Sequence, residues 1–269
     1  MNSLSVVIIT YNEEHNIAEC IKSAKLVSHD IVVVDCGSSD QTVAIATNEG
    51  ARTFIIEWRG YGFSKNFGAA QAKFNWIFSI DADERINEEL ASAVRKMNFM
   101  ESSCIYKFRR KNHIDRKEIR FGTLGFEMVE RIYHRHGTRW NLAPVHEKLV
   151  GIQPIKKTIA GNLLHFGLKS FDDHQQKAIG YARLSAEKYL AQGKTTYLLQ
   201  RAGSAIFNSV KSYVFLLGFI DGKQGFFIAK SIAYYSWLKY FYLRQLLRAS
   251  IPHEIRTHKR GMAIKAVSN

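Results

Sequence analysis

The residues best suited to chemistry form an acidic cluster, Asp81, Asp83 and Glu84, directly after the apolar stretch 76–80. An apolar run of this length is typical of a buried parallel strand, and uncompensated carboxylates at its end are costly. A hard divalent cation would explain them, because it binds one or two carboxylates and shares its other positions with water and phosphate. The alternative is that Asp81 or Asp83 simply caps the helix that follows.

Polar residues also end two earlier apolar runs. Residues 4–9 lead into Thr10, Tyr11, Asn12 and Glu13, and residues 31–34 lead into Asp35. If these strands are parallel neighbours of the stretch 76–80, all three ends meet at one edge, where open α/β sheets bind ligands. The chain contains neither GxGxxG after its first strand nor GxxxxGK[ST]. We therefore expect a nucleotide site in which a metal, not a glycine-rich loop, holds the diphosphate.

A second chemical pair, His146 and Glu147, follows Pro144. Proline excludes a helix through this point and favours an extended segment before it. Such a pair could supply a general base, a metal ligand or both. The alternative is a solvated turn.

The elements that must position these residues alternate along the first part of the chain. Apolar runs at 4–10, 31–34, 52–57 and 76–80 are separated by short helical patterns, including one at about 64–73. This alternation predicts a parallel sheet covered on both faces. The stretches 105–109 and 130–135 alternate as half-exposed strands.

The pattern becomes helical from about residue 165, and the charge changes with it. Residues 1–165 hold 22 Lys and Arg against 19 Asp and Glu, a balance of +3, whereas residues 166–269 hold 16 against 5, a balance of +11. We expect a catalytic domain over 1–165 and a basic, aromatic-rich helical region over 166–269. The aromatic residues and interleaved cations of 226–247 suit a helix at a membrane interface and equally a helix packed on the sheet domain.

Composition sets the wider class. The 269 residues suffice for a large core, and the three cysteines, Cys20, Cys36 and Cys104, show no disulfide framework. No window of about 18 uninterrupted apolar residues indicates a spanning helix, and the first residues do not resemble a signal peptide. A reducing cytoplasmic location fits these features.

Three segments together resemble a known family. Residues 6–14 (VVIITYNEE), 32–40 (VVVDCGSSD) and 79–84 (SIDADE) are similar to the inverting family 2 glycosyltransferases of GT-A fold. Residues 144–147 (PVHE) and 218–225 (GFIDGKQG) resemble the bacterial subgroup that adds a sugar to the lipopolysaccharide core, usually from UDP-glucose in β-1,4 linkage to a heptose. The resemblance covers nearly the whole chain.

The resemblance implies a role for each candidate residue. Thr10 and Tyr11 would line the nucleobase, with Asn12 and Glu13 beside them in the nucleotide-sugar site, and Asp35 would accept from the uracil N–H. Lys65 would lie near the ribose or phosphate, and Asp81 would help to place the ribose and the metal. Asp83 would bind the Mg²⁺ or Mn²⁺ that bridges the diphosphate, and His146 would be a further metal ligand or a contact to the acceptor. The general base would be Glu147, with Glu130 and Glu127 as rivals.

The function expected from these features is metal-dependent transfer of a hexose from a UDP-sugar to a glycan or glycolipid at the cytoplasmic face of the inner membrane. The acceptor expected is the lipopolysaccharide inner-core heptose, and the alternatives are capsule, another glycolipid or protein. A basic module that binds nucleic acid or lipid is a competing interpretation of the charged tail, but it does not need three acid-tipped strands, so we expect no nucleic-acid partner. A nucleotidyltransferase, which also uses paired carboxylates, would release pyrophosphate instead of UDP.

Overall fold

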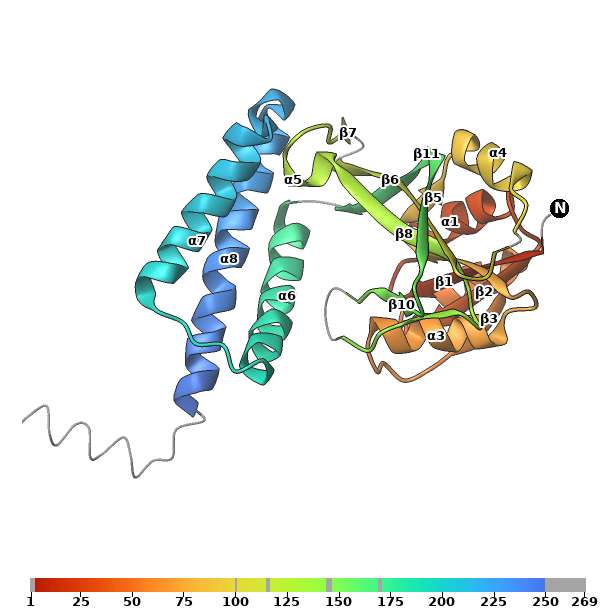
Figure 1. Cartoon of the computed structure of the whole chain (residues 1–269), viewed down its shortest axis with the longest axis horizontal. Helices are drawn as coiled ribbons and strands as arrows, with labels where there is room; N and C mark the ends of the chain where they lie inside the picture. Colours follow the sequence, from red (N-terminus) through yellow and green to blue (C-terminus); the bar gives the residue numbers. More distant parts are fainter. Residues whose placement is uncertain (1–2, 100, 115–116, 144–146, 169–170, 250–269) are drawn as a thin grey trace, which may run out of the picture.

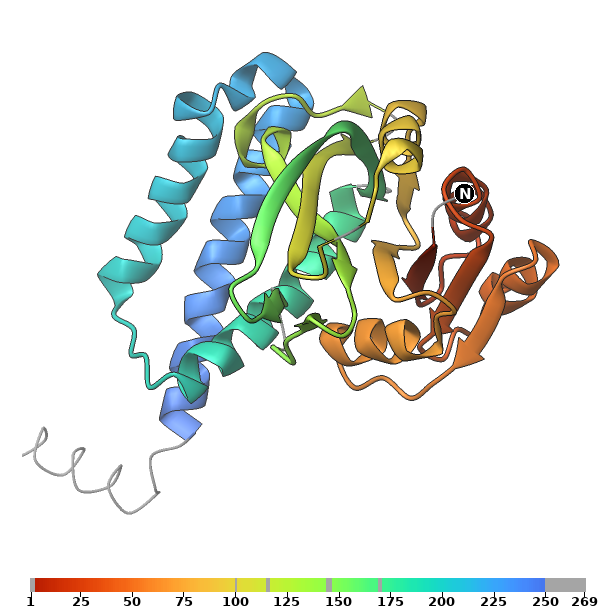
Figure 2. The same cartoon turned by 45° about the vertical axis from the view of Figure 1, so that its right-hand side comes forward.

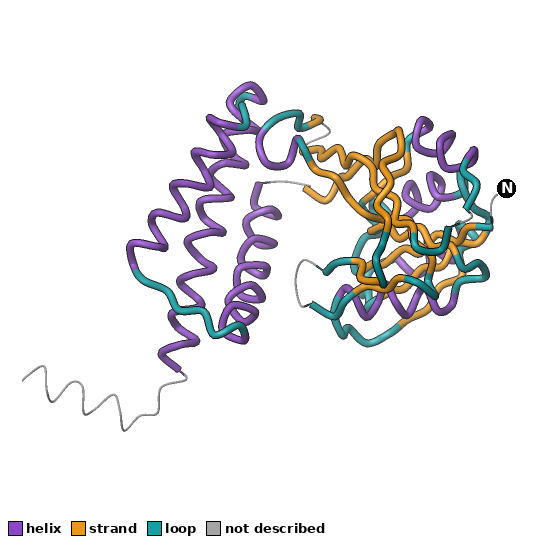
Figure 3. The backbone as a smooth tube through the Cα atoms, in the orientation of Figure 1, coloured by secondary structure: helices purple, strands orange, loops and turns teal. Residues whose placement is uncertain are grey.

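The computed structural model describes residues 3–99, 101–114, 117–143, 147–168 and 171–249. Strands gather at one end of the molecule and long helices at the other (Figure 3). The strand-rich part comes first in the chain and the helical part last (Figure 1). The expected α/β class with flanking helices and a C-terminal helical extension is therefore confirmed.

Most strands join one large sheet, in the order β3-β2-β1-β4-β8-β6-β11-β5, with β7 paired to β6. The strands are β1 (Leu4–Thr10), β2 (Asp30–Asp35), β3 (Arg52–Ile55), β4 (Trp76–Asp81), β5 (Glu84–Ile86), β6 (Cys104–Ile114), β7 (Lys117–Glu118), β8 (Glu127–His134) and β11 (Ile155–Leu168); β9 (Thr138–Trp140) and β10 (Leu149–Gly151) form a separate pair. The block β3-β2-β1-β4 is wholly parallel, as the alternation predicts. Beyond it, β8 runs antiparallel to both β4 and β6, and β11 runs parallel to β6.

Helices cover both faces of the parallel block. They are α1 (Ile17–Ala24), α2 (Thr42–Asn48), α3 (Tyr61–Gln71) and α4 (Glu88–Lys96). The short α5 (Gly122–Gly125) precedes β8. The described chain ends with α6 (Phe171–Ala191), α7 (Leu198–Val210), the π-helical segment η1 (Lys211–Phe215), the 3-10 turn η2 (Gly218–Asp221) and α8 (Lys223–Ala249). Successive β1 side chains point to opposite faces. Val6 and Ile8 pack with α1 and α4, whereas Val7 and Ile9 pack with α3.

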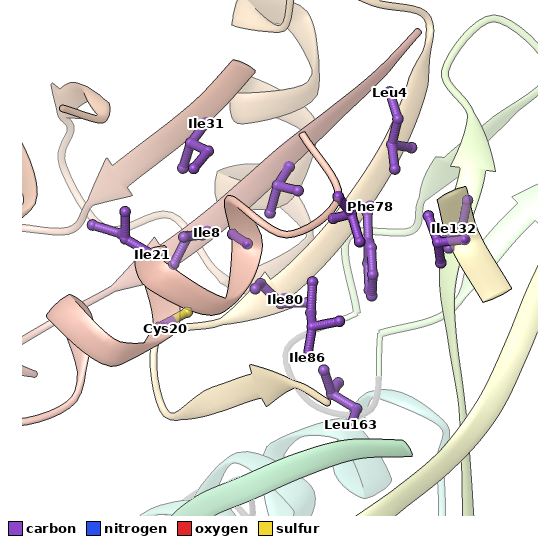
Figure 4. Close-up of a cluster of buried hydrophobic side chains, with 14 of the residues drawn as sticks. Leu4, Ile8, Cys20, Ile21, Ile31, Phe78, Ile80, Ile86, Ile132 and Leu163 are labelled. Atoms are coloured by element: carbon purple, nitrogen blue, oxygen red, sulfur yellow. The ribbon is translucent and has the colours of Figure 1, made fainter. Parts of the chain in front are cut away.

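The larger core lies on the α1 and α4 face (Figure 4). Ile8, Ile21, Phe78 and Ile80 are fully buried there, and Leu163 of β11 packs at its border. All three cysteines are buried and free, as their spacing predicts. This packing fixes β1, β2 and β4 rigidly, so the polar residues at their ends are held by a well-ordered scaffold.

Two sequence expectations need correction. The residue that caps α4 is Asn87, whose side chain accepts from the Leu90 N–H at 2.9 Å, so the interpretation of Asp81 or Asp83 as a helix cap is wrong. The second concerns α8, which packs mainly between α6 and α7 (Figures 1 and 2). Its contact with the sheet domain lies near its start, where Ile228 packs with Ile114 of β6 and with Ile119. The expected domain boundary after residue 165 falls inside β11, and the helices begin at Phe171.

Candidate active site

The three polar strand ends lie side by side. In the parallel register Thr10 is opposite Asp35, and Ile9 is opposite Asp81. The convergence expected from the sequence is therefore present in the backbone. The Thr10 hydroxyl is buried at this edge and has no hydrogen-bond partner among the described residues.

The loops after β1 and β2 are tied together by side chains. The Asp35 carboxylate accepts from the Gly37 and Ser38 N–H groups and from the Ser38 hydroxyl. The Asn12 N–H donates to the same hydroxyl, and its side-chain oxygen accepts from the Ser39 N–H at 2.8 Å. These bonds hold Asn12 at a φ of 52°, where asparagine is tolerated better than most residues. Asp35 thus fixes the conformation of the loop after β2, and any contact with a nucleobase would be in addition to this role.

The two other predicted residues of the first loop differ in environment. The Tyr11 side chain is largely exposed, so its ring face is open to a ligand. Glu13 serves the backbone of the loop: its N–H donates to the Thr42 hydroxyl, and its carboxylate accepts from the Asn16 side chain at 2.7 Å. Glu13 therefore fixes the start of α1.

The Asp81 carboxylate lies between two cations. Its Oδ2 accepts from Arg131 of β8 at 2.9 Å, and its Oδ1 lies 3.3 Å from the Lys65 ammonium of α3. Burial alone raises the pKa of Asp81, but the charges of Arg131 and Lys65 outweigh it and hold the pKa well below its ordinary value. Asp81 is therefore ionised, and both of its oxygens already face positive partners.

A buried ion network extends from Asp81 across the sheet. Glu84, fully buried, accepts from Arg131 at 2.7 Å and from Arg110 of β6 at 3.0 Å. Its other oxygen accepts from the Asp81 N–H at 2.9 Å. Arg110 also forms a two-point pair with Glu127. Because each buried charge has partners, the free-energy cost of removing these charges from water is offset, and the network fixes the turn that carries Asp81 and Asp83.

Lys65 also joins the second predicted pair to the strand edge. Its side chain is almost wholly buried, and its ammonium donates to Glu147 Oε1 at 2.6 Å. The ammonium lies 4.5 Å from the centre of the Trp140 ring. Thus Glu147 is brought beside Asp81 although the two residues are distant in sequence. His146 lies outside the described residues.

Asp83 faces a histidine that the sequence analysis did not single out. The Asp83 Oδ2 lies 3.5 Å from His165 Nε2 of β11, and the Asp83 carbonyl accepts from the Phe166 N–H. Asn112 bonds the other ring nitrogen, Nδ1, at 2.6 Å and so orients the imidazole. Burial lowers the pKa of His165, but the Asp83 carboxylate more than compensates and raises it above its ordinary value.

Gly167 leaves the space beside Asp83 and His165 unfilled. A Cβ atom on Gly167 would lie 2.4 Å from Asp83 Oδ2 and 2.5 Å from His165 Nε2, so only glycine fits beside both atoms. A carboxylate oxygen and an imidazole nitrogen whose opposite nitrogen is already bonded form a suitable partial ligand set for a divalent ion.

The described residues contain no group of three or more His, Cys, Asp and Glu side chains arranged for a metal. Two protein ligands are nevertheless enough for Mg²⁺ or Mn²⁺ when a diphosphate and water complete the shell. Asp83 and His165 fit that requirement better than Asp81, whose oxygens face Arg131 and Lys65. The only sequence signals for His165 are that two apolar residues, Leu163 and Leu164, lead into it and that a glycine follows two residues later.

The rival bases Glu127 and Glu130 also have cationic partners. Both oxygens of Glu127 accept from Arg110, and Asn112 also donates to one of them. Burial raises the pKa of Glu127, but Arg110 outweighs it and lowers the pKa below its ordinary value, which makes this carboxylate a weak base. Glu130 pairs with Lys156 at 2.5 Å.

Helix α6 comes close to the same edge. The Tyr181 hydroxyl of α6 lies 3.3 Å from the Tyr61 hydroxyl of α3. Burial, Tyr61 and the charges of Asp81 and Asp83 together raise the pKa of Tyr181 above its ordinary value. The start of the helical region therefore borders the candidate site.

Comparison with known proteins gives a consistent result. The sequence model of a family described as "Glycosyl transferase family 2" matches residues 5–163. The lipopolysaccharide core biosynthesis glycosyltransferase LpsC of Rhizobium meliloti is 30% identical over 202 residues, which cover 71% of this chain and 73% of that protein. An uncharacterized glycosyltransferase of Rickettsia prowazekii is 27% identical over 259 residues, which cover 91% of this chain and 88% of that protein.

Among solved structures, the chain is similar to glucosyl-3-phosphoglycerate synthase from Mycobacterium tuberculosis in complex with Mn²⁺, UDP and glucosyl-3-phosphoglycerate. The identity is 24% and the TM-score 0.33, and the match covers 41% of this chain and 44% of that one.

Proposed function

This chain belongs to glycosyl transferase family 2 and is a glycosyltransferase, and from that premise we propose that it transfers a hexose from a UDP-sugar with the help of a divalent cation. The family resemblance read from the three N-terminal segments is thereby confirmed. The single observation that supports the proposal most is the pair Asp83 and His165, which meet over Gly167 beside the converging strand ends.

We propose that Asp83 and His165 hold Mg²⁺ or Mn²⁺, with Asp81 beside them and His146 as a candidate further ligand. When bound, the cation would neutralise the charge that develops on the departing UDP. Asn112 keeps His165 oriented through Nδ1, and Gly167 keeps Asp83 and His165 close enough to share one ion. In this assignment Asp81 acts mainly through its two cationic partners.

The nucleotide would occupy the loops after β1 and β2. Tyr11 offers an exposed ring for stacking, Thr10 offers a buried hydroxyl without a partner among the described residues, and Asp35 is the acceptor proposed for the uracil N–H. Asn12 and Glu13 hold the loop in shape through their hydrogen bonds. Lys65, fixed between Asp81 and Glu147, is proposed to lie next to the ribose or phosphates.

Glu147 is the proposed general base. Lys65 holds its Oε1, so we assign Oε2 as the atom that takes the proton of the acceptor hydroxyl. The hydroxyl oxygen then forms a bond to the anomeric carbon from the side opposite the diphosphate. The bond from that carbon to the diphosphate oxygen breaks, its electron pair leaves with UDP, and the configuration inverts.

The proposed acceptor is a cell-surface glycan, and the inner-core heptose of lipopolysaccharide is the first choice, with glucose as the sugar transferred. The similarity to LpsC, which is named for lipopolysaccharide core biosynthesis, supports this choice. Such an acceptor would place the enzyme at the cytoplasmic face of the inner membrane. None of the helices in the described part of the chain has both the length and the apolar character needed to cross a bilayer. We propose the catalytic domain to be the part through β11 and the helical region to be α6 onward.

A product assay tests the proposal. Purified protein with UDP-glucose and Mn²⁺ should release UDP and not glucose 1-phosphate, and Asp83→Asn should reduce the rate at least a hundredfold. The matched control is Glu57→Gln, because Glu57 is an exposed acid on the same domain. Release of glucose 1-phosphate, the product of nucleotidyl transfer from UDP-glucose, would favour a nucleotidyltransferase, and an unchanged rate in folded Asp83→Asn would remove the metal role.

A further inference from the structure

Helix α7 presents apolar side chains to the outside. Its exposed positions are Leu199, Gln200, Gly203, Ile206, Phe207 and Val210, a spacing that places them on one helical face with Gln200 at its border. Leu199 is 87% exposed, and Ile206 and Phe207 are each 64% exposed. A helix that packs on its neighbours normally turns such residues inward. In α7 the inward positions are instead taken by Arg201, Ala205 and Asn208.

The apolar face continues beyond the helix. Val214 and Phe215 of η1 and Phe219 and Ile220 of η2 are exposed, and Phe215 is 74% exposed. We call the exposed apolar residues of α7, η1 and η2 the outer face. Helix α7 forms the edge of the molecule farthest from the sheet in both views (Figures 1 and 2). The helix that carries most of the outer face therefore lies at the edge away from the strand-rich part.

Charge around the outer face has one sign. The segment that carries the outer face, residues 199–223, contains three cations, of which Arg201 is buried, and a single acid, Asp221. Asp221 is buried and accepts from the Arg120 and Phe121 N–H groups, so it contributes little negative charge to the surface. Exposed cations include Lys211 within η1 and Lys223 at the start of α8.

We propose that the outer face docks on an anionic lipid bilayer, with the apolar side chains entering the headgroup region and the lysines pairing with lipid phosphates. Exposed apolar residues supply buried area, and a cationic border supplies attraction to negative lipid; a helix at a membrane interface has both. A second copy of this chain is the less suitable occupant, because two such faces would bring like charges together. The proposal does not depend on the donor or the acceptor of the reaction.

The test uses the full chain and cosedimentation with vesicles of phosphatidylcholine alone or with 30% phosphatidylglycerol. We expect binding to the anionic vesicles, weakened by high salt, and at least a tenfold weaker affinity for the double variant Phe207→Ser/Phe215→Ser. The matched control is Ile55→Ser/Ile152→Ser, which removes two exposed apolar side chains from the strand-rich part and should bind as the wild type does. A second pair, Leu199→Ser/Ile206→Ser, repeats the test if the first variant melts early.

Several results would overturn the proposal. One is that the wild type does not bind anionic vesicles. Another is that the wild type and both outer-face variants bind equally, and a third is that the control variant loses as much binding as the outer-face variants. A wild type that is a dimer by sedimentation velocity, with a monomeric outer-face variant that binds vesicles as before, would assign the face to self-association. Release of UDP in the product assay is a separate readout, so failure of membrane docking and failure of catalysis are distinguishable.

Discussion

At the scale of single residues, the two aspartates of the acidic cluster have different environments. Asp81 is held by Arg131 and Lys65, whereas Asp83 faces His165. A carboxylate between two cations has less capacity to bind a third. In our proposal the metal would therefore be held mainly by Asp83, and Asp81 would link it to Lys65 and so to the proposed base.

Gly167→Ala tests the opening between Asp83 and His165. The new Cβ would lie within 2.5 Å of a ligand atom on each side chain, so both must move and Mn²⁺ affinity should fall about tenfold or more. Calorimetric titration of Mn²⁺ in the presence of UDP measures the effect. Gly180→Ala is the control, because a Cβ there meets no atom within 4 Å and alanine favours the helix. Equal Mn²⁺ affinity in wild type and Gly167→Ala would contradict this assignment.

Glu147→Gln tests the general base. Glutamine keeps an oxygen for Lys65 but cannot take a proton, so kcat should fall by roughly 10² to 10⁴ while UDP affinity changes little. Glu130→Gln, which removes a carboxylate that pairs with Lys156, should retain most activity. The assignment would be wrong if kcat survived in Glu147→Gln or fell equally in both variants.

At the scale of elements, Asp30 joins four parts of the parallel block. At the start of β2 it accepts from Ser5 of β1, Arg52 of β3 and the Lys73 N–H before β4. Burial raises the pKa of Asp30, but these hydrogen bonds and the Arg52 charge lower it below its ordinary value of 3.8. The stability that Asp30 adds is therefore present above that value and lost as the pH falls toward the lowered pKa.

Asp30→Asn should lower the free energy of unfolding at pH 7 by about 2–3 kcal/mol, because Arg52 then lacks its charged partner. The difference from the wild type should shrink below pH 3.8. Urea denaturation at pH 7, 4.5 and 3.5 measures it, with Glu57→Gln as an exposed control expected within about 0.5 kcal/mol. A difference that does not depend on pH would contradict the ionised role of Asp30.

The parallel block is predictable from sequence because long β-branched runs such as those of β1 and β2 are buried on both faces. Strand β5 is three residues long and lies in a charged segment, so no periodicity indicates it. His165 is brought to Asp83 by the pairing of β11 with β5 and β6, and pairing between strands distant in sequence has no local signature. Sequence alone therefore locates Asp83 but not its partner.

At the scale of the whole molecule, the enzyme proposed here has two ends with different tasks. The strand ends and Tyr181 in the middle of α6 border the candidate active site, and helix α7 lies at the opposite edge (Figure 2). The basic, aromatic composition indicates from sequence alone that the C-terminal region is unusual. It does not indicate which of its helices pack together or which apolar side chains stay exposed, because tertiary contacts decide both. A bilayer at the outer face would leave the donor site open to the solvent that carries nucleotide-sugars.

The most direct measurement of the central claim is the melting temperature with UDP, with and without Mn²⁺, for wild type and Asp83→Asn. Ligand at about a hundred times Kd stabilises the folded state by about 2.7 kcal/mol, which for a chain of this size corresponds to roughly 5–10 °C. We predict a shift of that size for wild type only when UDP and Mn²⁺ are present together, and almost none for Asp83→Asn. An equal shift without Mn²⁺, or a full Mn²⁺-dependent shift in Asp83→Asn, would contradict a metal-bridged diphosphate at Asp83.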